Sequence, residues 1–134
     1  MQLTRRYRFS ASHRLDVASL TPEENRRLFG KCNNPYGHGH NYVVDVTLEG
    51  SRDVSGQLAG RQELDSYVTQ KILARLDHKN LNADVAELAS VTPTTENLAL
   101  AICAMLKKEW PFRADLKRVR IAETERNIFE LEAK

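Results

Sequence analysis

Two histidines, His38 and His40, stand one residue apart in the stretch CNNPYGHGHNY, and Cys32 opens the same stretch. In an extended strand, alternate residues face the same side about 7 Å apart, so both imidazoles can reach one ion. Neutral imidazole nitrogens favour zinc among the common metal ions. Histidines on an apolar face can also be packed polar residues, and the H-x-H spacing alone does not separate the two interpretations.

His13 is the third histidine that could join such a site. It lies on the buried side of its own predicted strand, where Phe9 and Ala11 share its parity. If this strand pairs with the strand that carries His38 and His40, the three imidazoles converge. Three histidines with an open fourth position are typical of a catalytic zinc site, whereas structural zinc sites usually carry more cysteines. The predicted cofactor is therefore zinc.

The two cysteines have different predicted roles. Cys32 lies between the turn at Gly30 and the histidines, and a partly exposed thiol beside a cation ionises readily. The spacing equally allows Cys32 to be a zinc ligand or a small buried residue. Cys103 lies inside an apolar helix, next to its buried stripe, and is predicted to belong to the core.

The fourth histidine, His78, directly follows Asp77 in the stretch LDHKNLN. A carboxylate beside an imidazole can orient the ring and stabilise its cation. Because adjacent residues seldom bond each other well, the pair can instead serve a third group. The sequence leaves open whether His78 takes part in chemistry.

Glu123 continues the apolar face of a predicted strand, after Val119 and Ile121. A carboxylate in such a place must find a partner, because burying an unpaired charge is costly. That partner is either Arg126 or a backbone amide, or else a ligand that offers two adjacent N–H donors. The second possibility would make Glu123 a binding residue.

Length and composition limit the class of protein. The chain has 134 residues, of which 41% are hydrophobic and 28% charged, and its net charge is +2. This length predicts one domain over residues 1–134, small enough for subunit association to add stability. The charge balance predicts no nucleic-acid or membrane partner, and no apolar run approaches the ~20 residues of a membrane span. Without a signal-peptide pattern, we expect a cytoplasmic protein with reduced cysteines.

Hydrophobic periodicity predicts the elements that position these groups. The predicted strands cover residues 3–13, 38–50, 116–123 and 127–131, the two long helices 61–76 and 94–110, a short helix 20–30 and a loop 77–82. Thr21 caps the short helix, Pro22 lies in its first turn and Gly30 ends it. Either Thr94 or Thr95 begins the second long helix. The order of elements predicts an α+β fold, an antiparallel sheet with helices on one face.

The motifs FSASHRL, LFGKCNNPYGHGHNY, LDHKNLN, TTEN and ETERN follow one another in this order. With them the chain resembles the 6-pyruvoyl tetrahydropterin synthase family, which also holds 6-carboxytetrahydropterin synthase. The resemblance implies a T-fold: a four-stranded antiparallel sheet with two long helices on one face, three subunits closing a barrel, and two trimers stacking into a homohexamer. It also implies a zinc-dependent lyase that converts 7,8-dihydroneopterin triphosphate to 6-pyruvoyl tetrahydropterin with elimination of triphosphate.

The resemblance also implies roles for the metal-binding stretch. By position, the family's zinc ligands fall on His13, His38 and His40, and its catalytic cysteine falls on Cys32. Zinc would then act as a Lewis acid on the hydroxyls of the substrate side chain. Cys32, as a thiolate, would take a carbon-bound proton.

Further roles fall on the other motifs. The family's Asp–His pair falls on Asp77 and His78, and it is expected to come from a neighbouring subunit. Its pterin-anchoring glutamate falls on Glu123, whose two oxygens would grip the pterin N3–H and 2-amino groups. The residues implied to lie near the pterin are Thr94, Thr95 and Glu96.

The sequence departs from the family pattern at two places outside these residues. Gly60 and Arg61 stand where the family has a polar and an apolar residue before the first long helix, and Pro93 stands where serine is common. The spacing Cys-x5-His-x-His resembles the pyruvoyl synthases, since the carboxy-synthases typically have Cys-x3-His-x-His. The carboxy-synthase activity, which leads toward queuosine precursors, is the alternative. A non-catalytic pterin-binding member is a second alternative. The presence of Cys32 and His78 argues against it.

Overall fold

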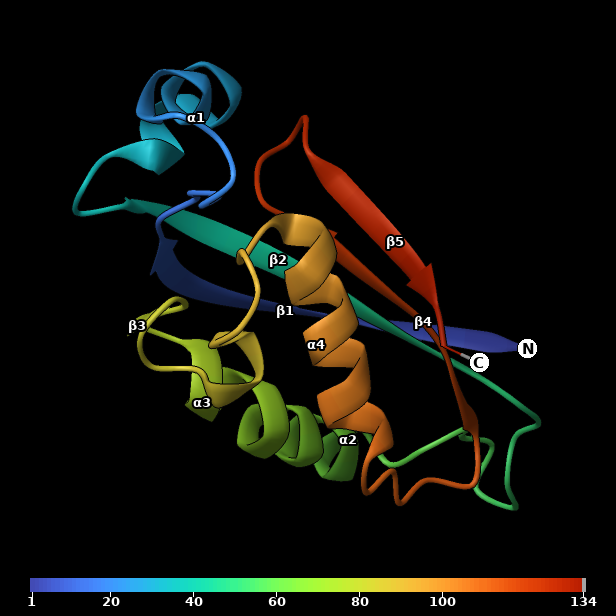
Figure 1. The fold of residues 1–134 in the computed structure, drawn as a ribbon. Coiled ribbons are helices and arrows are strands. Elements are labelled where there is room, and N and C mark those ends of the chain that lie inside the picture. Colours follow the sequence, from blue (N-terminus) through green and yellow to red (C-terminus); the bar gives the residue numbers. More distant parts are fainter. Residues whose placement is uncertain (134) are drawn as a thin grey trace.

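A computed structural model describes residues 1–133 as one sheet with helices packed on one face (Figure 1). The strands are β1 (Gln2–His13), β2 (His38–Glu49), β3 (Lys79–Asn80), β4 (Asp115–Ala122) and β5 (Ile128–Glu132). Their order across the sheet is β3-β1-β2-β4-β5. Four strands pair antiparallel, as predicted, but β3 adds a fifth strand parallel to β1, so the predicted count of four is wrong.

The extra strand arises from the segment predicted as a loop. Only two residue pairs join β3 to β1, and backbone bonds from Leu81 N to Ser12 O and from His78 N to Ser10 O flank them. Two residues are too few to show an alternation of apolar and polar side chains. The pairing therefore depends on where the preceding helix ends relative to β1.

The helices follow the predicted order. They are α1 (Pro22–Phe29), α2 (Arg61–Val68), a π-helical turn (Thr69–Leu73), α3 (Ala74–Leu76) and α4 (Thr95–Lys107), with 3-10 turns η1 (Gly30–Asn33) and η3 (Ala86–Leu88). Thr21 and Glu24 form a capping box at the start of α1, and Gly30 ends the helix with φ +56°. The departure at Gly60 lies at the start of α2, where it is the N-cap.

One apolar core lies between the sheet and helices α2 and α4, which cross the same face of the sheet (Figure 1). The sheet contributes Phe9, Tyr42, Val44, Val46, Val119 and Ile121, and the helices contribute Leu64, Ile72, Leu98, Ile102 and Leu106. Cys103 is buried in this core, as predicted. Because residues two apart along β1 share a face, the core continues up to His13.

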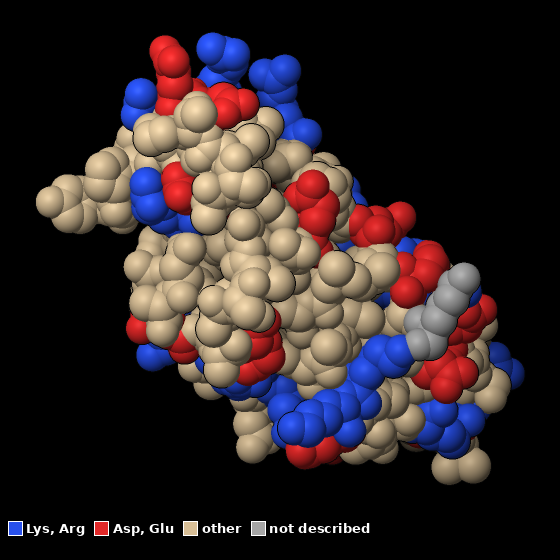
Figure 2. Space-filling model, in the orientation of Figure 1, with Lys and Arg blue, Asp and Glu red and all other residues tan. Residues whose placement is uncertain are grey.

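The opposite face of the sheet is polar. The hydroxyl oxygens of Thr4 and Thr47 lie 2.8 Å apart, and Ser10 donates to Asn41 Oδ1 at 2.6 Å. The helix side, seen in Figure 2, carries its charged side chains mainly around the rim of the molecule. Within residues 1–133, no helix is long and apolar enough to cross a membrane. The cytoplasmic location stays a prediction.

A charge cluster on the polar face stabilises the sheet. Asp45 is only 6% exposed, and its carboxylate accepts bonds from Arg6 Nε at 2.7 Å, Arg6 Nη2 at 3.0 Å and Arg120 Nη1 at 3.2 Å. These bonds, that of Arg6 above all, lower the pKa of Asp45. The carboxylate therefore stabilises the fold above its unfolded pKa of about 3.9, and this contribution is lost as pH falls through the lower, folded pKa.

We expect Asp45→Asn to reduce the free energy of unfolding at neutral pH by about 1.5–3 kcal/mol, the usual range for a hydrogen bond to a charged group. The difference from the wild type should shrink as the pH falls below about 4. Urea unfolding at neutral and acid pH measures both effects. Asp115→Asn is the matched control, because Asp115 is exposed at the start of β4. An equal cost at both pH values would contradict the linkage.

Candidate metal and catalytic site

The pairing of β1 with β2 brings the histidines together. His13 is directly opposite His38, and Ala11 is opposite His40. Because residues two apart share a face, all three histidines lie on the helix-facing side of the sheet. The predicted convergence of the two strands is confirmed by this register. Helix α1 sits at the same end of the sheet, where β1 ends and β2 begins (Figure 1).

Four side chains converge at this end of the sheet. The Nε2 atoms of His13 and His40 lie 3.1 Å apart, and Cys32 Sγ lies 3.3 Å from the first and 3.5 Å from the second. Glu123 Oε1 lies 3.4 Å from His13 Nε2 and 3.1 Å from His40 Nε2. All four ligand atoms lie within 4.8 Å of one another. We call these four residues the convergent cluster.

A hydrogen bond at Nδ1 of His13 fixes the protonation of the ring, because Nδ1 lies on the side away from the cluster. His13 Nδ1 lies 2.9 Å from the carbonyl oxygen of Pro93, and the His13 side chain is buried. A carbonyl oxygen can only accept, so the proton is on Nδ1 and Nε2 is free to bind a metal. Two imidazole nitrogens, a thiol and a carboxylate oxygen pointing at one small space fit a zinc ion.

The electrostatics of the cluster favour neutral imidazoles. Burial is the largest cause that lowers the pKa of His13 and of His40, although the carboxylate of Glu123 raises both. Burial also raises the pKa of the Cys32 thiol, and Glu123 adds to that rise. Metal binding requires deprotonated imidazole nitrogens, which this environment provides. A thiolate at Cys32 requires a cation nearby.

His38 lies beside the convergent cluster rather than in it. Its ring packs edge-on against the ring of His40, with centroids 4.7 Å apart and an interplanar angle of 81°. The structure thus brings His13 and His40 together with Cys32 and Glu123, and places His38 next to them. The set of three histidine ligands stays a prediction.

The turn between β4 and β5 positions Glu123. Glu123 N donates to Asn127 O at 3.0 Å, and Asn127 Nδ2 donates to Glu123 Oε2 at 2.6 Å. The hydroxyl of Thr124 accepts bonds from two backbone amides of the same turn. The hydrogen-bond partner of the carboxylate is therefore Asn127, not Arg126, and the Nε2 atoms of His13 and His40 are its near neighbours. Asn127 ends the ETERN motif, but nothing in the sequence alone marks its role.

Asp77 and His78 lie in a different place from the convergent cluster. Asp77 Oδ1 accepts a bond from Ser10 N at 2.9 Å, and His78 N donates to Ser10 O at 2.6 Å. His78 has a φ of +60°, an uncommon value for a residue other than glycine, and its side chain is 82% exposed. Its Nε2 atom is 3.6 Å from Asp77 Oδ2, too far for a good hydrogen bond. Strained backbone of this kind is often found at functional sites.

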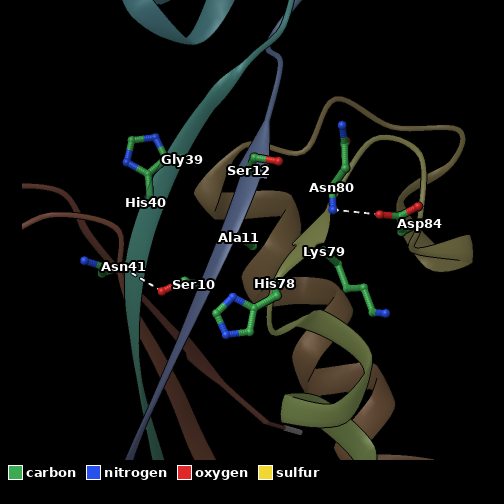
Figure 3. A pocket seen from close by; sticks show the side chains of 10 residues that line it. All are labelled: Ser10, Ala11, Ser12, Gly39, His40, Asn41, His78, Lys79, Asn80 and Asp84. Atoms are coloured by element: carbon green, nitrogen blue, oxygen red, sulfur yellow. Dashed lines mark hydrogen bonds between the residues drawn. The ribbon is translucent and has the colours of Figure 1, made fainter.

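His78 lines a cavity of about 500 Å³ beside the strands β1, β2 and β3 (Figure 3). The side chains of Ser10, Ser12 and Asn41 in this cavity alternate with the helix-facing residues, so they belong to the polar face. In Figure 3, helix α4 lies behind the strands that carry these side chains. The helix-facing residues Ala11 and His40 also line the cavity, so the Asp77–His78 pair lies at the β3 edge of the sheet, apart from Cys32.

A family model described as 6-pyruvoyl tetrahydropterin synthase matches residues 2–134. The chain belongs to the 6-pyruvoyl tetrahydropterin synthase family. The chain is similar to the human 6-pyruvoyl tetrahydrobiopterin synthase, with 48% identity over 128 residues, 95% of this chain and 88% of the human one. A putative 6-carboxy-5,6,7,8-tetrahydropterin synthase of Archaeoglobus fulgidus is 32% identical over 88 residues, 66% of this chain and 69% of that one.

A solved structure agrees with this membership. The 6-pyruvoyl tetrahydropterin synthase of Caenorhabditis elegans superposes with a TM-score of 0.88 at 36% identity, covering 100% of this chain and 96% of that one. The α+β architecture predicted from the sequence is thus confirmed, both by the strands and helices described above and by this member of the family.

The segment around Pro93 connects the start of α4 to the cluster. Thr94 is the N-cap of α4, and its hydroxyl accepts a bond from Asn97 N at 3.2 Å, so Thr94 caps the helix and Thr95 is its first residue. Thr95 is buried and Glu96 is exposed. Pro93 meets His13 through its backbone carbonyl, which the serine common in the family would also offer. A carbonyl contact leaves no mark in the sequence, so this link was missed.

Proposed function

We propose that this chain is a zinc-dependent carbon–oxygen lyase that converts 7,8-dihydroneopterin triphosphate to 6-pyruvoyl tetrahydropterin with elimination of triphosphate. The observation that carries the proposal is the convergent cluster, in which a thiol and a carboxylate lie beside two imidazoles fit to bind a metal. Relatives named as 6-pyruvoyl tetrahydrobiopterin synthases support the substrate. In this proposal residues 1–134 form a single T-fold catalytic domain.

The proposed zinc ligands are His13, His38 and His40. Three histidines leave one coordination position open for substrate, as in catalytic zinc sites, whereas His13 and His40 with Cys32 and Glu123 would close all four. Directly opposed residues on antiparallel strands have their Cβ atoms about 4.5–5.5 Å apart, so His38 is within reach of an ion held by His13. This arrangement keeps the thiol and the carboxylate free.

The remaining residues act on the substrate. Zinc, when bound, supplies Lewis-acid polarisation of the substrate's side-chain hydroxyls. Cys32 removes a carbon-bound proton, and the Asp77–His78 pair of a neighbouring subunit tunes or relays it. Glu123 binds the pterin N3–H and 2-amino groups with its two oxygens. The residues proposed to lie near the pterin are Thr94, Thr95 and Glu96.

The two ends of the sheet support association of subunits. β3 covers β1 only at Ala11 and Ser12, so the first half of β1 forms an open edge in the described chain, and β5 forms the other edge. Open edges present unpaired backbone groups that favour pairing with another chain. We propose that three subunits close a barrel through these edges and that two trimers form a homohexamer. Its active sites lie between subunits, where Cys32 of one chain meets His78 of another.

The pyruvoyl product is favoured over the carboxy product. The pyruvoyl-type relative of human origin is 48% identical over 95% of the chain, whereas the carboxy-type relative from Archaeoglobus fulgidus is 32% identical over 66%. The presence of Cys32, Asp77 and His78 argues against a non-catalytic pterin-binding protein. These observations support an eliminating enzyme that forms the pyruvoyl product.

Incubating the zinc-loaded protein with 7,8-dihydroneopterin triphosphate tests the function. We expect triphosphate release and a product with the mass of 6-pyruvoyl tetrahydropterin. A 6-carboxy product would establish the alternative activity. Pterin binding without triphosphate release would identify a binding protein and overturn the proposal. Glu123→Gln serves as the matched variant, since it should raise the KM more than it lowers the kcat.

A further inference from the structure

Cys32 sits on a short turn that depends on contacts from elsewhere for its position. It lies in η1, a 3-10 turn of four residues, and such turns have poor internal hydrogen-bond geometry. The Cys32 carbonyl accepts a bond from Leu15 N at 2.7 Å. Leu15 follows His13 by two residues, so this bond joins the thiol-bearing turn to the chain that leaves the cluster.

The neighbouring residue Asn33 makes the same connection with its side chain. Asn33 is 6% exposed, and its Nδ2 donates to Leu15 O at 2.7 Å and to Asp16 Oδ1 at 2.9 Å. Leu15 N donates to the Cys32 carbonyl, and Leu15 O accepts from Asn33. Both backbone polar groups of Leu15 are therefore bonded to the turn. Asn33 therefore uses both of its amide protons to fix the turn against one short segment.

A second buried asparagine holds the rest of that segment. Asn25, on α1, is 2% exposed; its Oδ1 accepts from Val17 N at 2.8 Å, and its Nδ2 donates to the carbonyls of Val17, Leu20 and Thr21. Residues 15–21 are thus held between α1 and the Cys32 turn.

The segment that carries Cys32 makes another close contact further along the chain, at Gly37. Gly37 has a φ of +79°, and a Cβ at this position would lie 2.6 Å from the carbonyl oxygen of His13. The segment 30–37 thus contacts the chain at two places, Leu15 and Asp16 through Asn33 and the end of β1 through Gly37. Cys32 directly precedes the first of these contacts, so Asn33 is the side chain nearest in sequence that holds the turn.

We propose that Asn33 is a positioning residue for Cys32, one that holds the thiol-bearing turn so that the sulfur faces the reacting carbon of the substrate. The role of Cys32 in this inference rests on the proposed function. The hydrogen bonds of Asn33 to Leu15 and Asp16 do not depend on it. Asn33 has no hydrogen bond to the histidines, so its loss should leave the metal in place. A displacement of about 1 Å at a reacting group can cost a hundredfold in rate.

Asn33→Asp is the sharpest variant, because it keeps the shape and replaces the donor with a carboxylate facing Leu15 O and Asp16. We expect the kcat to fall about a hundredfold, with the KM changing less than about threefold and the zinc content unchanged. The Cys32 thiol of the zinc-loaded protein should also react at least about threefold faster with a chromogenic disulfide, since the turn is released. Cys103 is buried and serves as the internal reference.

The matched control is Asn34→Asp, the same change one residue later at an exposed position, which should behave as the wild type. If Asn33→Asp does not fold, Asp16→Asn removes the charge from one of the two acceptors and should lower the kcat several-fold by the same route. A kcat and a thiol reactivity of Asn33→Asp within twofold of the wild type would overturn the proposal. If the wild type released no triphosphate, the proposed function would fail. The thiol reaction would still test whether Asn33 holds the Cys32 turn in place.

Discussion

The zinc content of the purified protein is expected to fall from one ion per chain to a small fraction when His38 is replaced by alanine. The same loss is expected for His13→Ala and His40→Ala. A zinc site of this kind is worth on the order of 10 kcal/mol, so each of three ligands accounts for about 3 kcal/mol, or a hundredfold in affinity. Metal analysis after dialysis against a weak chelator measures the effect.

The controls decide between two ligand sets. Glu123→Ala should keep its zinc and lose substrate affinity first, because Glu123 is proposed to bind the pterin. His78→Ala removes an exposed imidazole outside the convergent cluster and should also keep zinc. If instead His38→Ala retained zinc and Glu123→Ala lost it, the metal would be held by the four residues of the convergent cluster. That outcome would leave no open position and would contradict the catalytic assignment.

The kcat of Cys32→Ala is expected to be lower than that of the wild type by a factor of about a hundred to ten thousand, while zinc and pterin binding remain. The reason is that a general base acts on the reaction and not on the docking of the substrate. His78→Ala should lose turnover as well. Steady-state rates, metal analysis and pterin binding on each variant provide the measurements. Loss of zinc in Cys32→Ala would make Cys32 a ligand instead of a base.

Mixing the two inactive variants tests where the site lies. His78 lies outside the convergent cluster that holds Cys32 in one chain, so we expect a shared site to need two chains. After dissociation and reassembly of Cys32→Ala with His78→Ala in equal amounts, about a quarter of the interfaces should pair an intact Cys32 with an intact His78. We expect up to about a quarter of the wild-type activity to return. No recovery in hexamers shown to be mixed would mean that one chain supplies both residues.

Local pattern was enough to predict much of the scaffold. The alternation along residues 3–13 and 38–50 predicted β1, β2 and the shared face of the three histidines. Thr21, Pro22 and Gly30 predicted both ends of α1, because caps and stops act on neighbouring residues only. The π-helical turn inside the predicted helix 61–76 was not predicted, since it changes the hydrogen-bond register without changing the apolar stripe.

The sequence by itself therefore determined which residues could carry chemistry and which faces of which elements they occupy, since both follow from side-chain type and a period of two or 3.6. Only the tertiary structure decided that Glu123 reaches the histidines across β2 and β4, and that the Pro93 carbonyl sets the protonated nitrogen of His13. It also decided that His78 lies outside the cluster that holds Cys32. These facts depend on contacts between residues far apart in the chain, and such contacts leave no periodic signal in the sequence.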